Sequence, residues 1–233
     1  MNARAIVALD VGRAAQASAL TARLGAACDF VKVGLELFTA EGPAIVRAMC
    51  AERREVFLDL KLHDIPNTVR GAARSAAATG ATLLSVHASG GRAMLAAAVE
   101  GAGASCGVLA VTVLTSLDAR ALGDAWGRPI ADVRDEVLRL AELAKSAGAH
   151  GIVCGGGEAA AVRDRFGGAL ATLVPGIRRA GASADDQARV TTPRDAVEAG
   201  ARYLVLGRAV TRAADPAAEL AAIRREMGEQ AAG

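Results

Sequence analysis

The sequence predicts a single (β/α)8 barrel, the TIM-barrel architecture of the α/β class, with residues 1–233 forming one domain. The length of 233 residues is close to the roughly 250 residues typical of this fold. Short β-rich runs alternate with Ala-rich segments of helical spacing along the whole chain, and eight such runs occur. No linker, low-complexity stretch or change in composition divides the chain. An open, doubly wound sheet is the structural alternative, because it has the same alternation.

Eight runs are expected strands, since each is short and rich in β-branched or other apolar residues. In chain order they are Arg4–Asp10, Phe30–Leu37, Glu55–Leu62, Ala81–Ser89, Gly107–Ser116, Gly151–Gly155, Thr172–Ile177 and Tyr203–Val210. Segments with helical spacing between them include Gly42–Arg53, Thr68–Thr79, Arg92–Ala102, Asp132–Ala147 and Glu158–Phe166. Thr192-Pro193 and Asp215-Pro216 each combine an N-cap residue with proline at the first helical position, which predicts two more helix starts.

The composition gives no reason to expect nucleic-acid or membrane binding. The net charge is +2, and aromatic residues, which stack on bases, make up 3% of the chain. The segment MNARAIVALD lacks the apolar core of a signal peptide, and no apolar run reaches transmembrane length. Cys28, Cys50, Cys106 and Cys154 are widely spaced without a CxxC pair, so we expect reduced core residues in a cytoplasmic protein.

The third expected strand carries two charges in an apolar run. Strand alternation places Phe57, Asp59 and Lys61 on the face that points into a barrel, and Val56, Leu58, Leu60 and Leu62 on the face toward the outer helices. Lys32 and Gly34 point inward on the second strand by the same argument, and Asp10 ends the first strand. The sequence therefore predicts that Asp10, Lys32, Asp59 and Lys61 converge at the C-terminal mouth, where such barrels place their active sites.

Lysine usage favours a catalytic interpretation of these charges. The chain has three lysines, Lys32, Lys61 and Lys145, and its other basic residues are arginines. Arginine does not release a proton at ordinary pH, whereas a lysine ammonium can. Two of the three lysines at inward strand positions indicate a site of proton transfer. A structural, buried Asp59–Lys61 ion pair is the alternative.

The loops after the seventh and eighth strands predict a phosphate site, which is the usual position for one in this fold. Two glycines allow close backbone approach and three polar side chains can donate hydrogen bonds: Gly176, Gly207, Arg178, Gln187 and Arg208. Each arginine alone would be interpreted as a solvated surface residue. The segment Arg179–Arg189 is long for such a loop, so we expect a lid that closes over the phosphate.

The remaining polar candidates give weaker signals. His63 lies where the third strand ends, and His87 ends the fourth strand, so their roles stay open. His150 precedes the sixth strand, at the opposite end of the barrel, and is interpreted as structural. Thr115 ends the fifth strand and can hydrogen-bond a substrate. No spacing typical of a metal site occurs, and Gly155-Gly156-Gly157 is interpreted as a flexible turn.

The segment DLKLHDIPNTV resembles the D-x-K-x-x-D-I-P-N-T signature of the orotidine 5′-phosphate decarboxylases. The resemblance extends over nearly the whole chain, through IVALD, VKVG, VHASGG, VTVLTS, PGIR, DQ, TP and GR, and fits the bacterial branch. The chain has GRAVT where the family commonly has GRPIT, and VPGIR in place of TPGIR. Neither departure removes a charged residue.

The resemblance implies decarboxylation of orotidine 5′-monophosphate (OMP) to uridine 5′-monophosphate (UMP) in de novo pyrimidine biosynthesis, without metal or cofactor. It implies that Lys61 donates a proton to C6 and that Asp59 lies beside the substrate carboxylate. Lys32 and Asp10 would hold ribose hydroxyls, with Thr115 near the pyrimidine. The phosphate would be held by Arg178, Gln187, Gly207 and Arg208.

The resemblance also implies a homodimer with shared sites, in which Asp64 and Thr68 reach the neighbouring subunit's site. Two alternatives stay open. Magnesium-dependent sugar-phosphate decarboxylases and hexulose-phosphate synthases resemble the D-x-K-x-x-D core, but they have an acidic residue where this chain has Lys32, which repels a divalent cation. The second alternative is a non-catalytic barrel that binds a nucleotide. The two inward lysines speak against it, because binding alone could use arginine.

Overall fold

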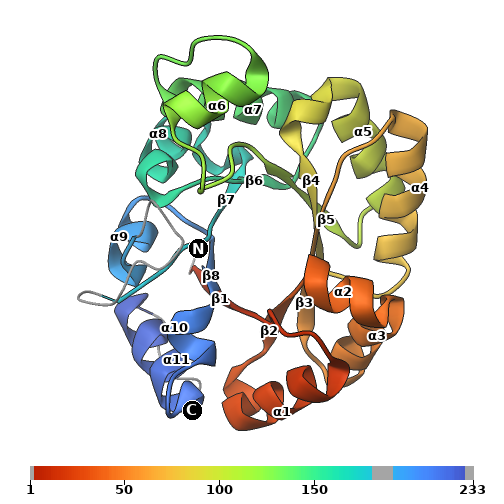
Figure 1. Cartoon of the computed structure of the whole chain (residues 1–233), viewed down its shortest axis with the longest axis vertical. Helices are drawn as coiled ribbons and strands as arrows, with labels where there is room; N and C mark the ends of the chain where they lie inside the picture. Colours follow the sequence, from red (N-terminus) through yellow and green to blue (C-terminus); the bar gives the residue numbers. More distant parts are fainter. Residues whose placement is uncertain (1–2, 180–190, 229–233) are drawn as a thin grey trace.

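The computed structural model describes residues 3–179 and 191–228. Within them, eight parallel strands pair in chain order and close into one barrel, with β8 hydrogen-bonded to β1 (Figure 1). The closed barrel is therefore confirmed, and the open sheet is wrong. The strands are β1 (Arg4–Ala8), β2 (Phe30–Gly34), β3 (Glu55–Leu62), β4 (Leu83–His87), β5 (Gly107–Val111), β6 (Gly151–Val153), β7 (Ala171–Val174) and β8 (Tyr203–Leu206).

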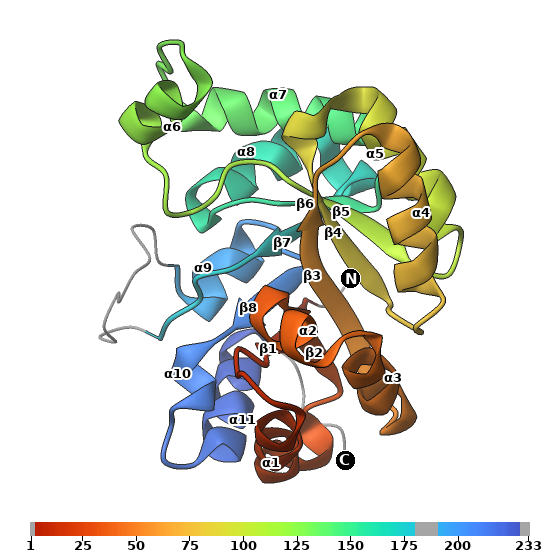
Figure 2. The same ribbon diagram turned by 45° about the vertical axis from the view of Figure 1, so that its right-hand side comes forward.

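Helices surround the barrel and lie outside its strands in both views (Figures 1 and 2). They are α1 (Ala14–Leu24), α2 (Leu35–Glu41), α3 (Pro43–Ala51), α4 (Pro66–Ala77), α5 (Gly91–Ala102), α6 (Ala119–Trp126), α7 (Val133–Ser146), α8 (Gly156–Phe166), α9 (Pro193–Glu198), α10 (Arg208–Thr211) and α11 (Pro216–Glu226). Short 3-10 turns occupy Gly25–Ala27, Ala88–Gly90 and Gly167–Ala169. The predicted N-caps are confirmed, since the Thr192 and Asp215 side chains accept hydrogen bonds from Asp195 N and Ala218 N.

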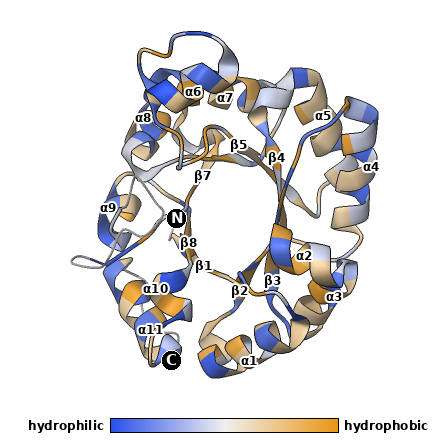
Figure 3. Cartoon of the chain, in the orientation of Figure 1, coloured by the Kyte–Doolittle hydropathy of each residue, from blue (hydrophilic) through white to orange (hydrophobic). Residues whose placement is uncertain are grey.

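The apolar core has two layers, as alternating side chains of a barrel require. Outward-facing strand residues such as Val56 and Leu58 pack against the helices, which carry both hydrophobic and hydrophilic residues (Figure 3). Inward-facing residues form a separate inner cluster, which fills the barrel below the mouth. It contains Ile6, Ala8, Phe30, Phe57, Leu83, Leu109, Leu173, Tyr203 and Val205.

Two predicted strands are wrong at their C-terminal ends. The second ends at Gly34, and Leu35 begins α2; the eighth ends at Leu206, and Arg208 begins α10. A short apolar run does not distinguish strand from helix, and glycine allowed the turn at each boundary. Gly156 and Gly157 begin α8 and Gly155 is its N-cap, so two of the three residues of the predicted flexible turn belong to a helix. The fifth predicted strand is also too long, since it ends at Val111 and not at Ser116. The third matches its prediction, Glu55–Leu62, and the remaining strands differ by one to three residues at one or both ends.

All four cysteines are free thiols; Cys28, Cys106 and Cys154 are buried in the core as predicted, whereas Cys50 is half-buried. Burial raises the pKa of Cys28 and of Cys106 to about 11, which keeps both thiols protonated and unreactive. In the described ranges, no helix is long and apolar enough to cross a membrane.

Candidate active site

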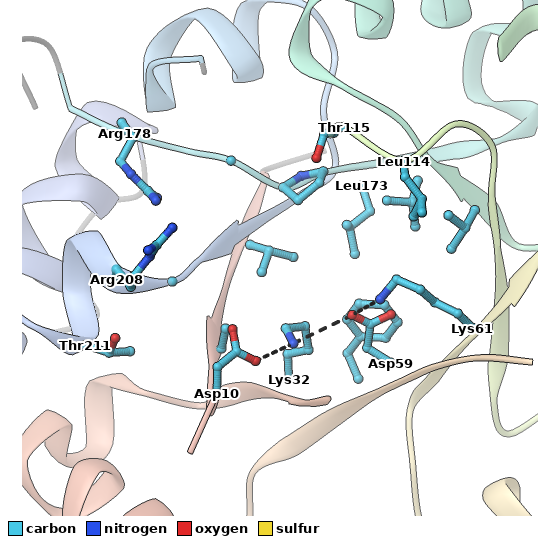
Figure 4. A pocket seen from close by; sticks show the side chains of 18 of the residues that line it. Asp10, Lys32, Asp59, Lys61, Leu114, Thr115, Leu173, Arg178, Arg208 and Thr211 are labelled. Atoms are coloured by element: carbon cyan, nitrogen blue, oxygen red, sulfur yellow. Dashed lines mark hydrogen bonds and ion pairs between the residues drawn. The ribbon is translucent and has the colours of Figure 1, made fainter. Parts of the chain in front are cut away.

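A cavity of about 450 Å³ opens at the C-terminal mouth of the barrel (Figure 4). Its size is typical of a small-molecule site. Nine of the predicted site residues line it: Asp10, Lys32, Asp59, Lys61, Thr115, Gly176, Arg178, Gly207 and Arg208. Alternation within β2 and β3 correctly placed Lys32, Asp59 and Lys61. The other residues follow the C-terminal ends of β1, β5, β7 and β8, which meet at the same mouth.

Two ammonium groups and two carboxylates form an alternating row along one wall of the cavity (Figure 4). Lys32 Nζ lies 2.8 Å from Asp10 Oδ1 and 3.6 Å from Asp59 Oδ2. Lys61 Nζ lies 2.8 Å from the same Asp59 oxygen. Each charge thus has an opposite charge beside it, which offsets the free-energy cost of removing these groups from water.

The Asp59 carboxylate is held in its ionised form. Burial alone would raise the pKa of Asp59, which is 8% exposed. The Lys32 and Lys61 ammonium groups, with hydrogen bonds from Lys61 and Ser85, outweigh burial and lower this pKa below its usual value. The carboxylate is therefore negatively charged at neutral pH.

The backbone of β3 is irregular where it presents Lys61. Leu58 pairs with Leu84 and Leu62 pairs with Val86, so four steps along β3 match two steps along β4. Within this bulge Lys61 has φ 50°, in the left-handed region that non-glycine residues rarely adopt. Such a conformation costs on the order of 1–3 kcal/mol and occurs most often at functional sites.

The sequence analysis did not predict the contacts that two residues make with the charged row. Ser85 of β4 is fully buried, and its hydroxyl contacts both the Lys61 backbone and the Asp59 carboxylate. Gly34 was expected to point inward, but its role is spatial: a Cβ there would lie 2.8 Å from Lys32 Nζ and 3.3 Å from Asp10 Oδ1. Strand parity was the available signal for Ser85, since it shares the inward face of β4 with His87.

The opposite side of the cavity carries two arginines (Figure 4). Arg178 follows β7, is 7% exposed and donates a hydrogen bond to the Ile177 carbonyl group. Arg208 begins α10, directly after β8. Thr211, the last residue of α10, and Arg212, its C-cap, also line this side and were not predicted as site residues. Gln187 and most of the predicted lid, Arg179–Arg189, lie outside the described residues.

Apolar side chains lie between the charged row and the arginines. Leu114, Leu173 and Val205 line the cavity together with Phe57 on its floor. Thr115 adds a hydroxyl on this side (Figure 4). This surface suits a flat ring that carries a few polar groups.

Asp64 and Thr68 do not line the cavity of their own chain. Both are exposed, Asp64 in the turn after β3 and Thr68 in the first turn of α4. The Asp64 carboxylate accepts a hydrogen bond from the Ile65 backbone N–H.

The histidines lie outside the cavity lining. The rings of His63 and His87 are 5.4 Å apart, beside the mouth. Burial, and then the nearby His63 and Lys61, lower the pKa of His87. His150 lies at the opposite end and hydrogen-bonds the Tyr203 hydroxyl at 3.1 Å, which confirms its structural interpretation. The described residues contain no group of three or more His, Cys, Asp or Glu side chains placed to hold a metal ion.

The model of the orotidine 5′-phosphate decarboxylase / HUMPS family matches residues 3–223. This chain belongs to that family. The matched range includes the DLKLHDIPNTV segment and every residue that lines the cavity.

Relatives within the family are closely similar over their full lengths. An orotidine 5′-phosphate decarboxylase from Anaeromyxobacter sp. (strain K) is 57% identical over 220 residues, covering 94% of this chain and 96% of that protein. One from Alkalilimnicola ehrlichii is 51% identical over 232 residues, covering 98% of each. The crystal structure of the orotidine 5′-phosphate decarboxylase from Lactobacillus acidophilus has a TM-score of 0.86 at 35% identity, with 97% of this chain and 99% of that chain covered.

Proposed function

We propose that this chain decarboxylates OMP to UMP and carbon dioxide in de novo pyrimidine biosynthesis. The observation that carries the proposal is the arrangement of the cavity, with the Asp10–Lys32–Asp59–Lys61 row on one side and Arg178 with Arg208 on the other. The identity of 57% to a protein named for this activity supports it. The positions of the charged row and of the two arginines on opposite sides of the cavity fit a nucleotide. Its carboxylate-bearing ring would lie at the charged row, and its phosphate would lie at the arginines.

Lys61 is the proposed proton donor. The bond between C6 and the carboxylate carbon breaks, the electron pair stays on C6, and carbon dioxide leaves. An ammonium fixed beside C6 stabilises the developing negative charge and then transfers one proton to that carbon. The neutral Lys61 amine regains its proton from solvent after product release.

Asp59 has two proposed effects on this step. Its carboxylate forms an ion pair with the Lys61 ammonium, 2.8 Å away, and so holds that ammonium beside C6. It also repels the substrate carboxylate, and that repulsion disappears as carbon dioxide forms. Lys32 and Asp10 complete the row and hold the ribose hydroxyl groups.

The arginine side of the cavity is the proposed phosphate site. Arg178 and Arg208 present donors that match phosphate oxygens, with the Gly207 backbone and Gln187 as further partners. Thr115 lies near the pyrimidine. Phosphate binding far from C6 supplies free energy that holds the ring against the charged row. Closure of Arg179–Arg189 over the phosphate remains part of this proposal.

The reaction proposed here needs no metal or cofactor, because the ammonium supplies the positive charge. The magnesium-dependent sugar-phosphate enzymes that resemble the D-x-K-x-x-D core have an acidic residue in place of Lys32, whose positive charge repels a divalent cation at that position. Relatives of 51% and 57% identity carry the decarboxylase name, which favours OMP over a sugar phosphate. The two lysines on the reacting side favour catalysis over simple nucleotide binding.

A homodimer with shared sites is also proposed. Asp64 and Thr68 lie exposed beside the mouth, where they are available to a second subunit. Three exposed apolar residues, Leu35, Ile65 and Leu114, follow strand ends at the same mouth, and a partner subunit would cover them. We further propose a single domain over residues 1–233 and a cytoplasmic location, which the four free thiols support.

The activity is tested with purified protein in excess EDTA. Incubation with OMP should remove the absorbance of the orotate ring and yield UMP at the rate seen without EDTA. A rate that depends on added Mg²⁺ would favour the sugar-phosphate relatives and contradict the proposal.

The shared site is tested by mixing two variants that are each expected to be inactive, Asp59→Ala and Asp64→Ala. A mixed dimer holds one site with both carboxylates intact. Random mixing in equal amounts should therefore restore about a quarter of the native activity, since half the dimers are mixed and each has one intact site of two. Mixed dimers without recovered activity would show that Asp64 acts within its own subunit or not at all.

A further inference from the structure

One buried hydroxyl group joins β4 to the two reacting side chains of β3. Ser85 lies in the middle of β4 and is 0% exposed. Its Oγ accepts a hydrogen bond from the Lys61 backbone N–H at 2.9 Å and donates one to Asp59 Oδ1 at 2.8 Å. A serine hydroxyl has one proton to donate and lone pairs to accept, so both bonds form at once.

The first bond lies at the break in the β3–β4 ladder. Pairing is regular up to Leu58–Leu84 and resumes at Leu62–Val86, and Lys61 adopts its positive φ between them. A side-chain oxygen of β4 receives the Lys61 N–H at this point. Ser85 thus stabilises the unusual backbone conformation from which the Lys61 side chain extends.

The second bond fixes the orientation of the Asp59 carboxylate. Oδ2 faces Lys61 Nζ at 2.8 Å and Lys32 Nζ at 3.6 Å, whereas Oδ1 faces Ser85. With both oxygens engaged, the carboxylate cannot rotate about its terminal bond without breaking a hydrogen bond to a charged group. Such bonds are about twice as strong as those between neutral groups.

We propose that Ser85 is a positioning residue for the decarboxylation, because its hydroxyl links the Lys61 backbone to the Asp59 carboxylate and so fixes the Lys61 ammonium at the reacting carbon. This inference rests on the proposed function. Ser85 does not touch the cavity, so it acts through Asp59 and Lys61 alone. A misplacement of the ammonium by a fraction of an ångström is costly, since proton transfer and charge stabilisation depend steeply on distance.

The test compares kcat and KM for OMP in Ser85→Ala and Ser85→Thr. Loss of two hydrogen bonds, one to a charged group, should lower kcat about 10- to 100-fold in Ser85→Ala, with KM within about threefold. Ser85→Thr keeps the hydroxyl and should retain kcat within about fivefold. If Ser85→Ala does not fold, Ser85→Cys carries the same test, because it keeps the volume and forms weak hydrogen bonds.

A pH profile separates positioning from a purely structural role. Without the Ser85 hydrogen bond the Asp59 carboxylate is easier to protonate, so the acid limb of kcat/KM should move to higher pH in Ser85→Ala. Thr79→Val is the matched control: it removes another buried hydroxyl, bonded to the Ala76 carbonyl outside the cavity, and should keep the native profile.

The outcomes distinguish this inference from the proposed function. An inactive wild-type protein would overturn the proposed function itself. An active wild type, with Ser85→Ala equal to it in kcat and in pH profile and only less heat-stable, would overturn the positioning role. A reduced kcat with a moved acid limb, reversed in Ser85→Thr, would support it.

Discussion

The two ends of the barrel interior are built from the same strands and have opposite chemistry. On β3 the inward residue Phe57 belongs to the apolar inner cluster, and the next inward residues are Asp59 and Lys61. On β2 Phe30 is followed by Lys32 in the same way. On both strands, an aromatic ring and a charged group occupy successive inward positions. The packed inner cluster fixes the distance between the strands. Because the same strands continue to the mouth, the charged groups there are held about 3 Å apart.

The two ends also contribute differently to stability. Burial of a large apolar side chain stabilises the fold by about 1.5–3 kcal/mol. A buried ion pair gains little net free energy, because desolvation offsets most of the attraction. We therefore expect substitutions at the mouth to affect activity and substitutions in the inner cluster to affect stability.

The largest expected effect is at the mouth. Lys61→Ala removes both the cation beside C6 and the proton donor, which together should reduce kcat by about 10⁴-fold or more. Circular dichroism and thermal melting should show a folded protein, since Lys61 is a partly exposed side chain.

Lys145→Ala provides the matched control for this loss. Lys145 is exposed on α7, with its ammonium 5.7 Å from the Phe166 ring. Its removal should leave kcat and KM at native values. Full activity in Lys61→Ala would contradict the assignment of Lys61 as proton donor. It would also contradict the expectation that substitutions at the mouth affect activity.

Phe30→Ala tests the opposite end of the barrel interior. It removes a 1% exposed ring from the inner cluster, away from the cavity lining, and should lower the free energy of unfolding by about 3–5 kcal/mol. Urea denaturation measures this loss. The fraction that stays folded should retain most of its kcat, because Asp59 and Lys61 keep their mutual contacts. A stable protein with severely reduced kcat would place Phe30 with the catalytic layer instead.

The comparison also explains which parts of the site were predictable. Lys32, Asp59 and Lys61 followed from period-two alternation, because the side-chain direction in a strand is a local property. Ser85 obeys the same rule, yet a serine in an apolar strand has no distinctive chemistry until Lys61 and Asp59 lie beside it. The positive φ of Lys61 was not predictable, since it arises where β3 and β4 pair out of register.

Element boundaries were the weakest part for a related reason. Leu35 and Arg208 follow apolar strands without a proline or a clear capping residue, so sequence pattern extended both strands into helices. The glycines before them are compatible with either structure. Only the closure of the barrel, a property of all eight strands, fixes where each strand stops.

A smaller effect is expected from Gly34→Ala, which tests whether the charged row needs the free space beside Gly34. In Gly34→Ala the new methyl group would meet Lys32 Nζ at 2.8 Å, so the ammonium must move. Because φ of Gly34 is −95°, alanine fits the backbone, and stability should change by less than about 1 kcal/mol. We expect kcat/KM for OMP to fall about tenfold through the displaced Lys32–Asp10 pair.

Gly168→Ala serves as the control for that substitution. It lies in the 3-10 turn at the other end of the barrel, and a Cβ there meets nothing within 4 Å. Steady-state kinetics should therefore distinguish the two alanines even though each adds a single methyl group. Equal kinetics in both variants would mean that Lys32 accommodates the methyl group without loss.

The smallest expected effect concerns pH at the lower end. Partial burial, and then Arg202, lower the pKa of His150, whose ring bonds the Tyr203 hydroxyl. The unfolded chain therefore binds a proton more readily, and the His150 contribution to stability is lost as pH falls below about 6.5. Since water screens this partly exposed group, the loss should stay under about 1 kcal/mol. Urea denaturation at pH 7.5 and 5.5 should show a smaller decrease in His150→Gln than in the wild type, with kcat equal in both proteins at each pH. A change in kcat would mean that the two ends of the barrel are coupled.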